Sequence, residues 1–323
     1  MAIKIASYNL WEGSKNTYFR FIDFVKEQNF DVLCLQEING WQDSGFAKLN
    51  DFNDRAGFTG YEYGNSNSEY KLATMSMLPI VSKTVHQEGY WHCVVEVHVK
   101  VGETELVIFN LHLDPWKEDP RVLEIDRLLK KVDMSKPTII TGDFNSLSRQ
   151  DNYSPEFLAM LQKRKFYKFG QDALDYRVTD KLTEAGFVDI AAKLSHLDVT
   201  APTQLGITSA SNEGVPVSEM PARIDYVFAS NIAAPMITDY AVIKNEETDK
   251  ISDHYPIVVT LEVEKPQTPA PLQAAMSESP AQPATPPSGP VPDTNPDPPT
   301  EPPVPKNTDT EGELIIKHDK SDD

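Results

Sequence analysis

Short apolar runs alternate with segments of helical periodicity over the first 264 residues of the chain. Residues 3–8 and 32–35 are apolar runs with the length of buried strands, and Phe19, Ile22 and Val25 recur between them at helical spacing. The order strand, helix, strand is typical of domains in which helices cover the faces of a sheet. The opening pattern therefore predicts an α/β fold.

A hairpin with one polar face is predicted next. Apolar and polar side chains alternate from Cys93 to Lys100, Gly102 is placed for a turn, and a second apolar run covers residues 106–111. Alternation with a period of two residues predicts strands with one buried and one polar face.

The later elements follow from the same two periods. Residues 120–132 predict an amphipathic helix with Leu123 and Leu128 on its inner face and Pro120 in its first turn. Gly186 is placed to end another helix. The other expected elements are a strand at 138–141, helices at 156–161 and 178–185, and strands at 224–229 and 257–261.

Proline content marks where this pattern stops. Fifteen of the 25 prolines fall between Pro266 and Pro305, in a stretch with few aromatic or branched aliphatic residues. Such a segment cannot bury enough apolar surface to offset the entropy of ordering. We therefore expect a folded domain at residues 1–264 and a disordered, Pro-rich, acidic tail at residues 265–323.

Net charge restricts the function classes. The chain carries a formal charge of −19, and the tail holds ten acidic and four basic residues, which leaves −13 on the residues before it. An acidic domain argues against binding to duplex DNA mainly through a basic surface. It does not exclude a small nucleic-acid substrate, because bound divalent metal offsets charge locally.

The chain shows no sign of export or membrane insertion. Residues 1–9 lack the basic and apolar regions of a secretory signal, and no apolar run approaches the length of a membrane span. Cys34 and Cys93 are the only cysteines, and Cys34 lies in an apolar run that predicts a core position. We expect a cytoplasmic protein and a monomer.

Polar side chains cluster at the ends of the predicted strands, where sheets commonly present functional groups. Six segments that are distant in sequence contribute acids, amides and two histidines. They are Asn9, Gln36-Glu37, His112, Asp143 with Asn145, Asp225, and Asp253-His254.

These residue types suit the hydrolysis of a phosphate ester. A hard cation such as Mg²⁺ prefers oxygen ligands, and Glu37 is the first candidate, with Asn9 and Asp253 as further ligands, some through water. Asp143 and Asn145 can orient or deprotonate the attacking water. His254 can bond the phosphate, or act as a base if a carboxylate holds its other nitrogen.

The ordered motifs resemble those of the endonuclease/exonuclease/phosphatase family over roughly residues 3–263. They are Asn9, the Leu-Gln-Glu of 35–37, the Asn-Leu-His of 110–112, the Gly-Asp-Phe-Asn of 142–145, the Ile-Asp-Tyr of 224–226 and the Ser-Asp-His of 252–254. The resemblance implies a four-layer α/β sandwich with two mostly antiparallel sheets face to face and helices outside. It also implies cleavage of phosphoester bonds with Mg²⁺ or Mn²⁺.

The resemblance also implies a role for each residue. Glu37 becomes the principal metal ligand with Asn9 and Asp253 beside it, Asp143 and Asn145 handle the water, and Asp225 and His254 form a carboxylate-histidine dyad. His112 matches a phosphate-contacting histidine of the deoxyribonuclease and sphingomyelinase branches. Abasic-site endonucleases carry other residues there, which argues against abasic-site repair.

Other polar and aromatic residues have plainer interpretations. The remaining histidines, including His92, are expected to be surface or structural residues, and the tryptophans, including Trp116, to be packing residues. The basic cluster at 163–168 is favoured as a solvated helix end over a nucleic-acid contact. Arg223 has two interpretations of equal weight, a contact with a substrate phosphate or an ion pair with a carboxylate such as Glu219.

Three functions follow. The first is an Mg²⁺-dependent phosphodiesterase, nuclease in type, with endonuclease and exonuclease action both open. The second is a hydrolase of a lipid or small-molecule phosphoester, which the acidic surface favours. The third is an inactive binding module whose tail recruits a protein partner through its closing apolar cluster at 313–317.

Overall fold

Two six-stranded sheets form the middle of the fold in the computed structural model, which describes residues 1–213 and 221–263. The first sheet has the order β11-β12-β1-β2-β4-β3. Its strands are β1 (Ala2–Asn9), β2 (Val32–Gln36), β3 (Gly60–Gly64), β4 (Leu72–Ser76), β11 (Ile237–Val242) and β12 (Ile257–Glu262). The expected tail, residues 265–323, lies outside the described residues.

The second sheet has the order β5-β6-β7-β8-β10-β9. Its strands are β5 (Ile80–His86), β6 (Val94–Val101), β7 (Thr104–His112), β8 (Thr138–Asp143), β9 (Phe187–Asp189) and β10 (Asp225–Ser230). Each sheet contains one parallel pair, β1 with β2 and β7 with β8, and its other pairs are antiparallel. The prediction of two mostly antiparallel sheets is confirmed.

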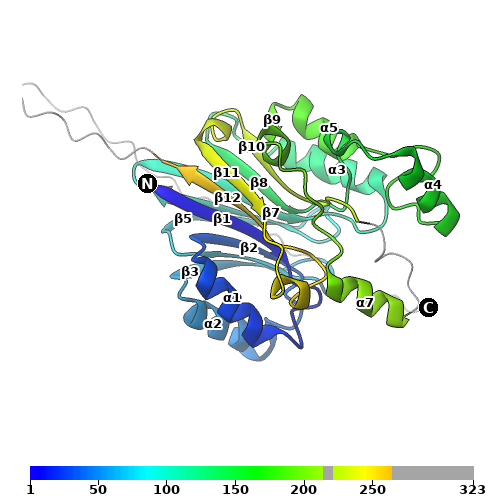
Figure 1. Ribbon diagram of the computed structural model, residues 1–323. Coiled ribbons are helices and arrows are strands. Elements are labelled where there is room, and N and C mark those ends of the chain that lie inside the picture. Colours follow the sequence, from blue (N-terminus) through cyan, green and yellow to red (C-terminus); the bar gives the residue numbers. More distant parts are fainter. Residues whose placement is uncertain (214–220, 264–323) are drawn as a thin grey trace, which may run out of the picture. The chain divides into compact units, whose positions relative to one another are not determined.

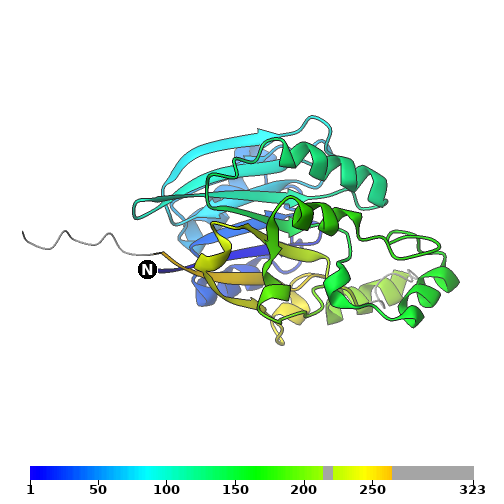
Figure 2. The ribbon, with the colours of Figure 1, turned by 90° about the horizontal axis from the view of Figure 1, so that it is seen from above.

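Helices cover the outer face of each sheet (Figure 1). The described α-helices are α1 (Tyr18–Gln28), α2 (Asp43–Ala56), α3 (Glu118–Leu129), α4 (Pro155–Arg164), α5 (Arg177–Glu184), α6 (Ile190–Lys193) and α7 (Gln204–Glu213). Within the described residues, 3₁₀ turns lie at Arg149–Asp151, Ala234–Met236 and Thr248–Lys250. Helices α1 and α2 pack on the first sheet, and α3 and α5 lie on the second (Figure 2). None of the helices in the described ranges has the length and apolar character needed to cross a membrane.

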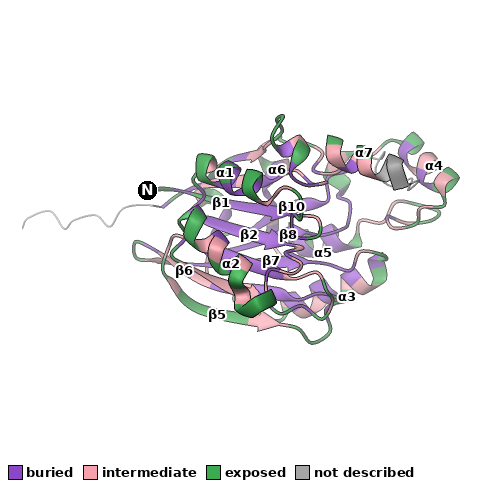
Figure 3. Ribbon diagram, turned by 90° about the horizontal axis from the view of Figure 1, so that it is seen from below, coloured by how far each residue is buried: buried purple, intermediate pink, exposed green. Residues whose placement is uncertain are grey.

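The hydrophobic core lies in three layers between these elements. Ile5 and Cys34 of the first sheet pack with Val97 and Ile108 of the second in the space between the sheets. Separate clusters join the first sheet to α1 and α2, and the second sheet to α3 and α5. Strands are largely buried while the helices expose their outer sides (Figure 3). The four-layer sandwich expected from the family resemblance is therefore confirmed.

Two side-chain assignments inside the predicted helices are wrong. Phe19 of α1 is 67% exposed, and Leu123 of α3 is 53% exposed. In α3 the inner face instead holds Arg121 and Glu124 beside Ile125. Apolar periodicity misassigned this helix because its buried face contains charged residues that hydrogen-bond to nearby loops.

Candidate functional site

The two-residue period of the strands carries polar side chains into the space between the sheets. In β1, Ile3 and Ile5 belong to the core between the sheets, and Asn9 lies on the same face four residues after Ile5. In β7, Ile108 belongs to that core and His112 follows on the same face. Inner faces that are apolar in the middle of the sandwich thus become polar at one end.

A pair of buried amides joins the sheets beneath this end. Gln36 Nε2 donates a hydrogen bond of 2.7 Å to Asn110 Oδ1, so that β2 and β7 are linked across the core. Asn110 Nδ2 donates to the carbonyl oxygens of Leu35 at 3.1 Å and Ala73 at 3.0 Å. Both amide side chains are fully buried. Loss of either partner would leave buried polar groups unpaired, so this link fixes how the two halves of the site meet.

Asn9 bridges two carboxylates that come from different sheets. Its Nδ2 donates to Glu37 Oε1 and to Asp143 Oδ2, both at 3.1 Å. Glu37 follows β2 with a positive φ of 57°, and its Oε2 accepts a hydrogen bond from the backbone N–H of Glu12 at 3.1 Å. One amide and one backbone donor therefore orient the Glu37 side chain.

The Gly-Asp-Phe-Asn segment forms a tight turn at the end of β8. Gly142 has φ of 143°, and a Cβ there would lie 1.9 Å from the carbonyl oxygen of Leu111, so only glycine fits. Asp143 Oδ1 accepts from the backbone N–H of Asn145 at 2.8 Å, and Asn145 Nδ2 donates to the Leu113 carbonyl at 3.1 Å. The turn holds the Asp143 carboxylate toward Asn9.

His254 and Asp225 form a buried hydrogen-bonded pair. His254 Nδ1 lies 2.8 Å from Asp225 Oδ2, and its Nε2 lies 3.8 Å from Asp143 Oδ2. Burial opposes a charge on the imidazole, but Asp225, Asp253 and Asp143 together raise the pKa of His254 well above its ordinary value. The Asp225 carboxylate therefore favours the protonated form of His254, whose Nε2 lies toward Asp143.

His112 lies on the other side of Asp143. Its Nε2 is 3.4 Å from Asp143 Oδ2 and 4.0 Å from Glu37 Oε1. Its ring stacks on that of His92, with centroids 4.1 Å apart and planes at 15°. Burial lowers the pKa of His112 well below its ordinary value and lowers the pKa of His92 to about 2. Burial therefore favours the neutral form of both rings.

The side chain of His92 is a part of the site that the sequence did not reveal. It is fully buried, and Ser68 Oγ lies 2.6 Å from its Nδ1. His92 comes just before β6 rather than at the end of a strand, so no strand-end motif singles it out.

A cavity of about 230 Å³ opens between these groups. Its lining includes Trp11, Glu37, His92, His112, Trp116 and Asp253. Burial and the repulsion of Asp253 raise the pKa of Glu37 to about 7, and burial also raises the pKa of Asp253. A partly enclosed space that concentrates carboxylates is suited to a cation.

Two sets of side chains could hold such a cation. Glu37 and Asp253 face the cavity, with Asn9 bonded to Glu37. Within the described residues, ligand atoms of Asp143, Asp225 and His254 also lie within 4.8 Å of one another. In that second set Nδ1 of His254 is already bonded to Asp225, which leaves only its Nε2 available.

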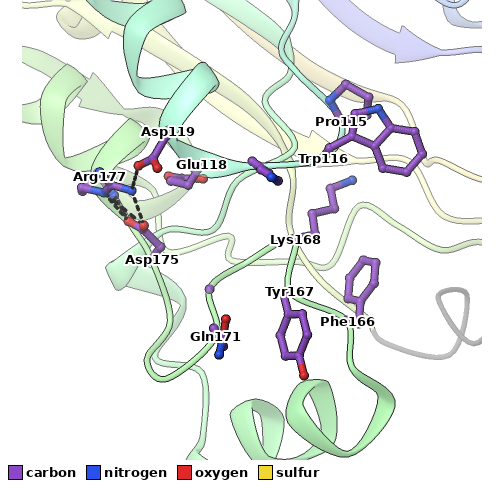
Figure 4. Close-up of a pocket in the computed structure, with 12 residues that line it drawn as sticks. Pro115, Trp116, Glu118, Asp119, Phe166, Tyr167, Lys168, Gln171, Asp175 and Arg177 are labelled. Carbon is purple, nitrogen blue, oxygen red and sulfur yellow. Dashed lines mark hydrogen bonds and ion pairs between the residues drawn. The ribbon is translucent and has the colours of Figure 1, made fainter.

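The structure contradicts what the sequence predicted for Lys168 and Trp116. Lys168 belongs to the cluster interpreted as a solvated helix end, yet it is half-buried and its Nζ donates a hydrogen bond to Asn145 Oδ1. Burial lowers the pKa of Lys168 to about 8, against the influence of Asp143. Trp116 is 65% exposed and so is not a packing residue. Both line a larger pocket next to the cavity (Figure 4).

Arg223 pairs with carboxylates, but with other ones than expected. It is 1% exposed, its Nε donates to Asp151 Oδ1 at 2.8 Å, and its Nη2 donates to Asp189 Oδ2 at 2.7 Å. Glu219, the partner named from the sequence, lies outside the described residues. This arrangement makes Arg223 a support of the dyad strand rather than a phosphate contact.

Comparison with known proteins gives a family match and several structures with the same fold. The family model described as "Endonuclease/Exonuclease/phosphatase family" matches residues 6–254. An AP endonuclease from Archaeoglobus fulgidus is 20% identical, with a TM-score of 0.61 over 81% of this chain and 100% of that chain. No curated protein matches the sequence.

Two further solved structures illustrate the range of this fold. An endonuclease/exonuclease/phosphatase from Beutenbergia cavernae is 17% identical, with a TM-score of 0.58 over 81% of this chain and 72% of that chain. D. rerio TDP2 complexed with a single strand DNA product is 18% identical, with a TM-score of 0.54 over 81% and 99% of the two chains. At these identities the structures establish the shared fold.

Proposed function

The chain belongs to the endonuclease/exonuclease/phosphatase family of hydrolytic phosphoesterases, and from this premise we propose that it is an Mg²⁺-dependent phosphodiesterase that cleaves nucleic acid. The observation that carries the proposal is the bridge from Asn9 to Glu37 and Asp143, because it joins carboxylates of both sheets beside two histidines. Six segments distant in sequence meet there. An arrangement of this kind serves a phosphate ester and a hard cation.

We assign the metal to Glu37, with Asp253 and Asn9 beside it, some of them through water. The residues fit a divalent cation, since the raised pKa of Glu37 reflects a carboxylate held near a second one without full solvation. Mg²⁺ is favoured because the donors are oxygens, and Mn²⁺ accepts the same set. When bound, the cation polarises the phosphoryl oxygen and stabilises charge on the leaving oxygen.

Asp143 and Asn145 are proposed to position the attacking water. Asp143 Oδ1 is held by the Asn145 N–H, and its Oδ2 is held by Asn9. The second oxygen also lies nearest to both histidine Nε2 atoms. A carboxylate fixed in this way can accept the proton of a water that attacks phosphorus in line with the leaving oxygen.

His254 and His112 are proposed to contact the phosphate. Asp225 fixes the Nδ1 proton of His254 and favours the imidazolium, so Nε2 can donate a hydrogen bond to a phosphate oxygen. We therefore favour the phosphate contact over the general base for His254. His112 donates as a neutral imidazole from the opposite side of Asp143.

The first experiment removes the proposed metal ligand. Purified protein is assayed with Mg²⁺ or Mn²⁺ on single-stranded and double-stranded oligonucleotides and on a chromogenic phosphodiester, with and without EDTA. We expect Glu37→Ala and EDTA each to lower turnover by about 10³ or more, since the charge stabilisation at phosphorus is lost. Glu27→Ala is the matched control, because Glu27 is an exposed glutamate of α1. Unchanged turnover in Glu37→Ala would refute the assignment.

A second candidate function changes the substrate to a lipid or small-molecule phosphoester. The net charge of −13 on residues 1–264 favours it, because a long polyanion is repelled by an acidic surface. A preference for sphingomyelin or an inositol phosphate over oligonucleotides would select this alternative. The inactive binding module, the tail partner, the monomeric state and the cytoplasmic location stay predictions from the sequence.

A further inference from the structure

A second pocket, of about 760 Å³, adjoins the catalytic cavity. Pro115 and Trp116 line both spaces, and Lys168 lines the larger one while its Nζ bonds Asn145 of the site. A phosphodiester has a substituent on each side of phosphorus. With the phosphate between Glu37 and the histidines, one substituent would extend past Trp116 into this second pocket.

The walls of this pocket present aromatic rings to solvent. Trp116 is 65% exposed and Tyr167 is 47% exposed, and Phe166 is half-buried against Phe169. The rings come from two segments, one before α3 and one after α4, with Lys168 extending toward Trp116 (Figure 4). Exposed flat rings beside a phosphate site offer stacking surfaces for bases.

The pocket lining is balanced in charge although the domain is acidic, with three acids and three bases. The acids of the lining are engaged, since Arg177 binds Asp119 at 2.6 Å and Asp175 at 2.7 Å. Glu118 accepts hydrogen bonds from Arg121 at 3.0 Å and Ser146 at 2.8 Å.

Two lysines contribute positive charge to the same pocket. Lys117 is exposed, and the half-buried Lys168 is bonded to the neutral amide of Asn145 rather than to a carboxylate. Lysine ammonium groups next to aromatic faces match a nucleotide, which combines a flat base with a charged phosphate.

A buried arginine holds the two walls at a fixed separation. Arg121 Nη1 donates to the carbonyl oxygen of Asp114 at 3.0 Å, just before Pro115 and Trp116. Its Nη2 donates to the carbonyl oxygen of Lys168 at 2.5 Å on the other wall. Arg121 is fully buried in α3, so the pocket does not have to be assembled by its ligand.

We propose that this pocket binds the base of the nucleotide next to the cleaved phosphate, with Trp116 and Tyr167 as stacking surfaces and Lys168 on the adjoining phosphate. The inference rests on the proposed nuclease function and deepens it. A base enters such a pocket only after it leaves the stack of a duplex, so the substrate is single-stranded nucleic acid or an unpaired end. This distinguishes the chain from a duplex nuclease held by a basic surface.

The test compares variants of the full chain on two oligonucleotides. One single-stranded oligonucleotide has normal bases, and its match has a base-free tetrahydrofuran unit next to the cleaved phosphate. We expect Trp116→Ala and Tyr167→Ala each to raise KM for the normal strand about tenfold with little change in kcat. For the base-free strand, the KM of the wild-type enzyme should already be about as high as the KM of the variants for the normal strand. Neither variant should raise it further.

Two controls separate stacking from loss of folded protein. Trp91→Ala removes a tryptophan that is 48% exposed elsewhere, and its KM should equal that of the wild type. Trp116→Phe keeps a flat ring and should restore most of the affinity lost in Trp116→Ala. Thermal unfolding of each variant verifies that the fold is intact.

The failures of the two proposals give different results. Cleavage of the normal strand with wild-type KM by both alanine variants would overturn the base pocket and leave the nuclease intact. Equal KM of the wild-type enzyme for the normal and base-free strands would overturn it as well. Absence of cleavage of any oligonucleotide, together with hydrolysis of a lipid phosphodiester, would refute the nuclease function and with it the base pocket.

Discussion

Two histidines approach the same carboxylate oxygen in this site and yet have pKa values shifted in opposite directions. His254 Nε2 lies 3.8 Å and His112 Nε2 lies 3.4 Å from Asp143 Oδ2. Behind His254 lies the carboxylate of Asp225, whereas behind His112 lies the stacked ring of His92. The pKa of His254 is raised and the pKa of His112 is lowered. Asp225, Asp253 and Asp143 raise the pKa of His254, whereas burial and the positive charges of His254 and Lys168 lower the pKa of His112.

This difference lets one site hold an ionic donor and a neutral donor on the two sides of a phosphate. In the proposed mechanism, an imidazolium at His254 would stabilise the charge that develops on the phosphoryl oxygens. A neutral His112 adds a hydrogen bond without placing a second positive charge near the proposed metal position at Glu37. Two like charges added to a metal site would weaken the binding of the cation.

The largest effect is expected when the carboxylate behind His254 loses its charge. Asp225→Asn keeps the shape of the side chain but removes the interaction that favours the imidazolium, so we expect kcat/KM to fall by about 10³. In the proposed mechanism the activity needs protonated His254, so we expect it to decline as pH rises through the pKa of this residue. Because the variant lowers that pKa, the alkaline decline should move to lower pH. The measurement is kcat/KM against pH.

Asp23→Asn is the control for this experiment, since Asp23 is an exposed aspartate of α1. Its pH profile should match that of the wild type. An Asp225→Asn profile with an unmoved alkaline decline would show that His254 is not the protonated donor, and that the comparison between the two histidines is wrong.

A smaller effect is expected at the neutral histidine. His112→Gln keeps a donor of similar reach but loses the stacked ring, and we expect kcat/KM to fall by about 10². The pH profile should keep its shape, because His112 does not change its charge in the neutral range. His196→Gln, at an exposed position, serves as the control. If the alkaline decline shifts in His112→Gln, the titrating group is His112 and not His254, and the interpretation of the two histidines is wrong.

Much of this site could be predicted from the sequence, namely the residues that lie at the ends of strands. Asn9 and His112 end strands whose inner faces begin with apolar residues and become polar toward the site, so alternation and position in the strand direct them there. His92 and Lys168 come from loops, and their places depend on packing against other segments. Arg121 belongs to a helix whose inner face is charged.

The same limit applies to the fold. The alternation of strands and helices predicted the α/β class and the hairpin β6–β7 from local sequence. Helix α2 and strand β3 carry weak apolar patterns, since their residues are largely half-exposed or polar, and they were not predicted. Periodicity reports which face is apolar and cannot identify a buried polar contact that only the tertiary fold creates.

Glu37 is a third titratable group beside the two histidines. Its Oε1 lies 4.0 Å from His112 Nε2, and the charge of His254 lowers its pKa. Its pKa is raised to about 7, so in the metal-free protein it is protonated below that pH and ionised above it. A proton and a cation compete for the carboxylate. We expect the Mg²⁺ concentration for half-maximal activity to rise about tenfold per pH unit below 7.

The measurement is a Mg²⁺ titration of activity at several pH values between 6 and 8 at constant ionic strength. Above pH 7 the half-maximal concentration should become constant, since Glu37 is then ionised before the cation binds. A half-maximal concentration that stays the same from pH 6 to pH 8 would contradict Glu37 as the principal ligand. His112→Gln should show the same dependence, because His112 is neutral throughout.

The smallest effect on activity is expected at His92, which supports His112 through its stacked ring. His92→Ala removes a buried ring and should lower the free energy of unfolding by about 3 kcal/mol. His112 would then lose its stacking partner, and kcat/KM should fall severalfold.

His92→Phe keeps the stacked ring and loses only the hydrogen bond with Ser68, worth about 1 kcal/mol, so its kcat/KM should return close to that of the wild type. Denaturant unfolding and kcat/KM measured on both variants separate the two contributions. If the phenylalanine variant is as impaired in kcat/KM as the alanine variant, the ring nitrogens of His92 matter more than its stacking. The hydrogen bond between His92 and Ser68 is then part of what supports His112.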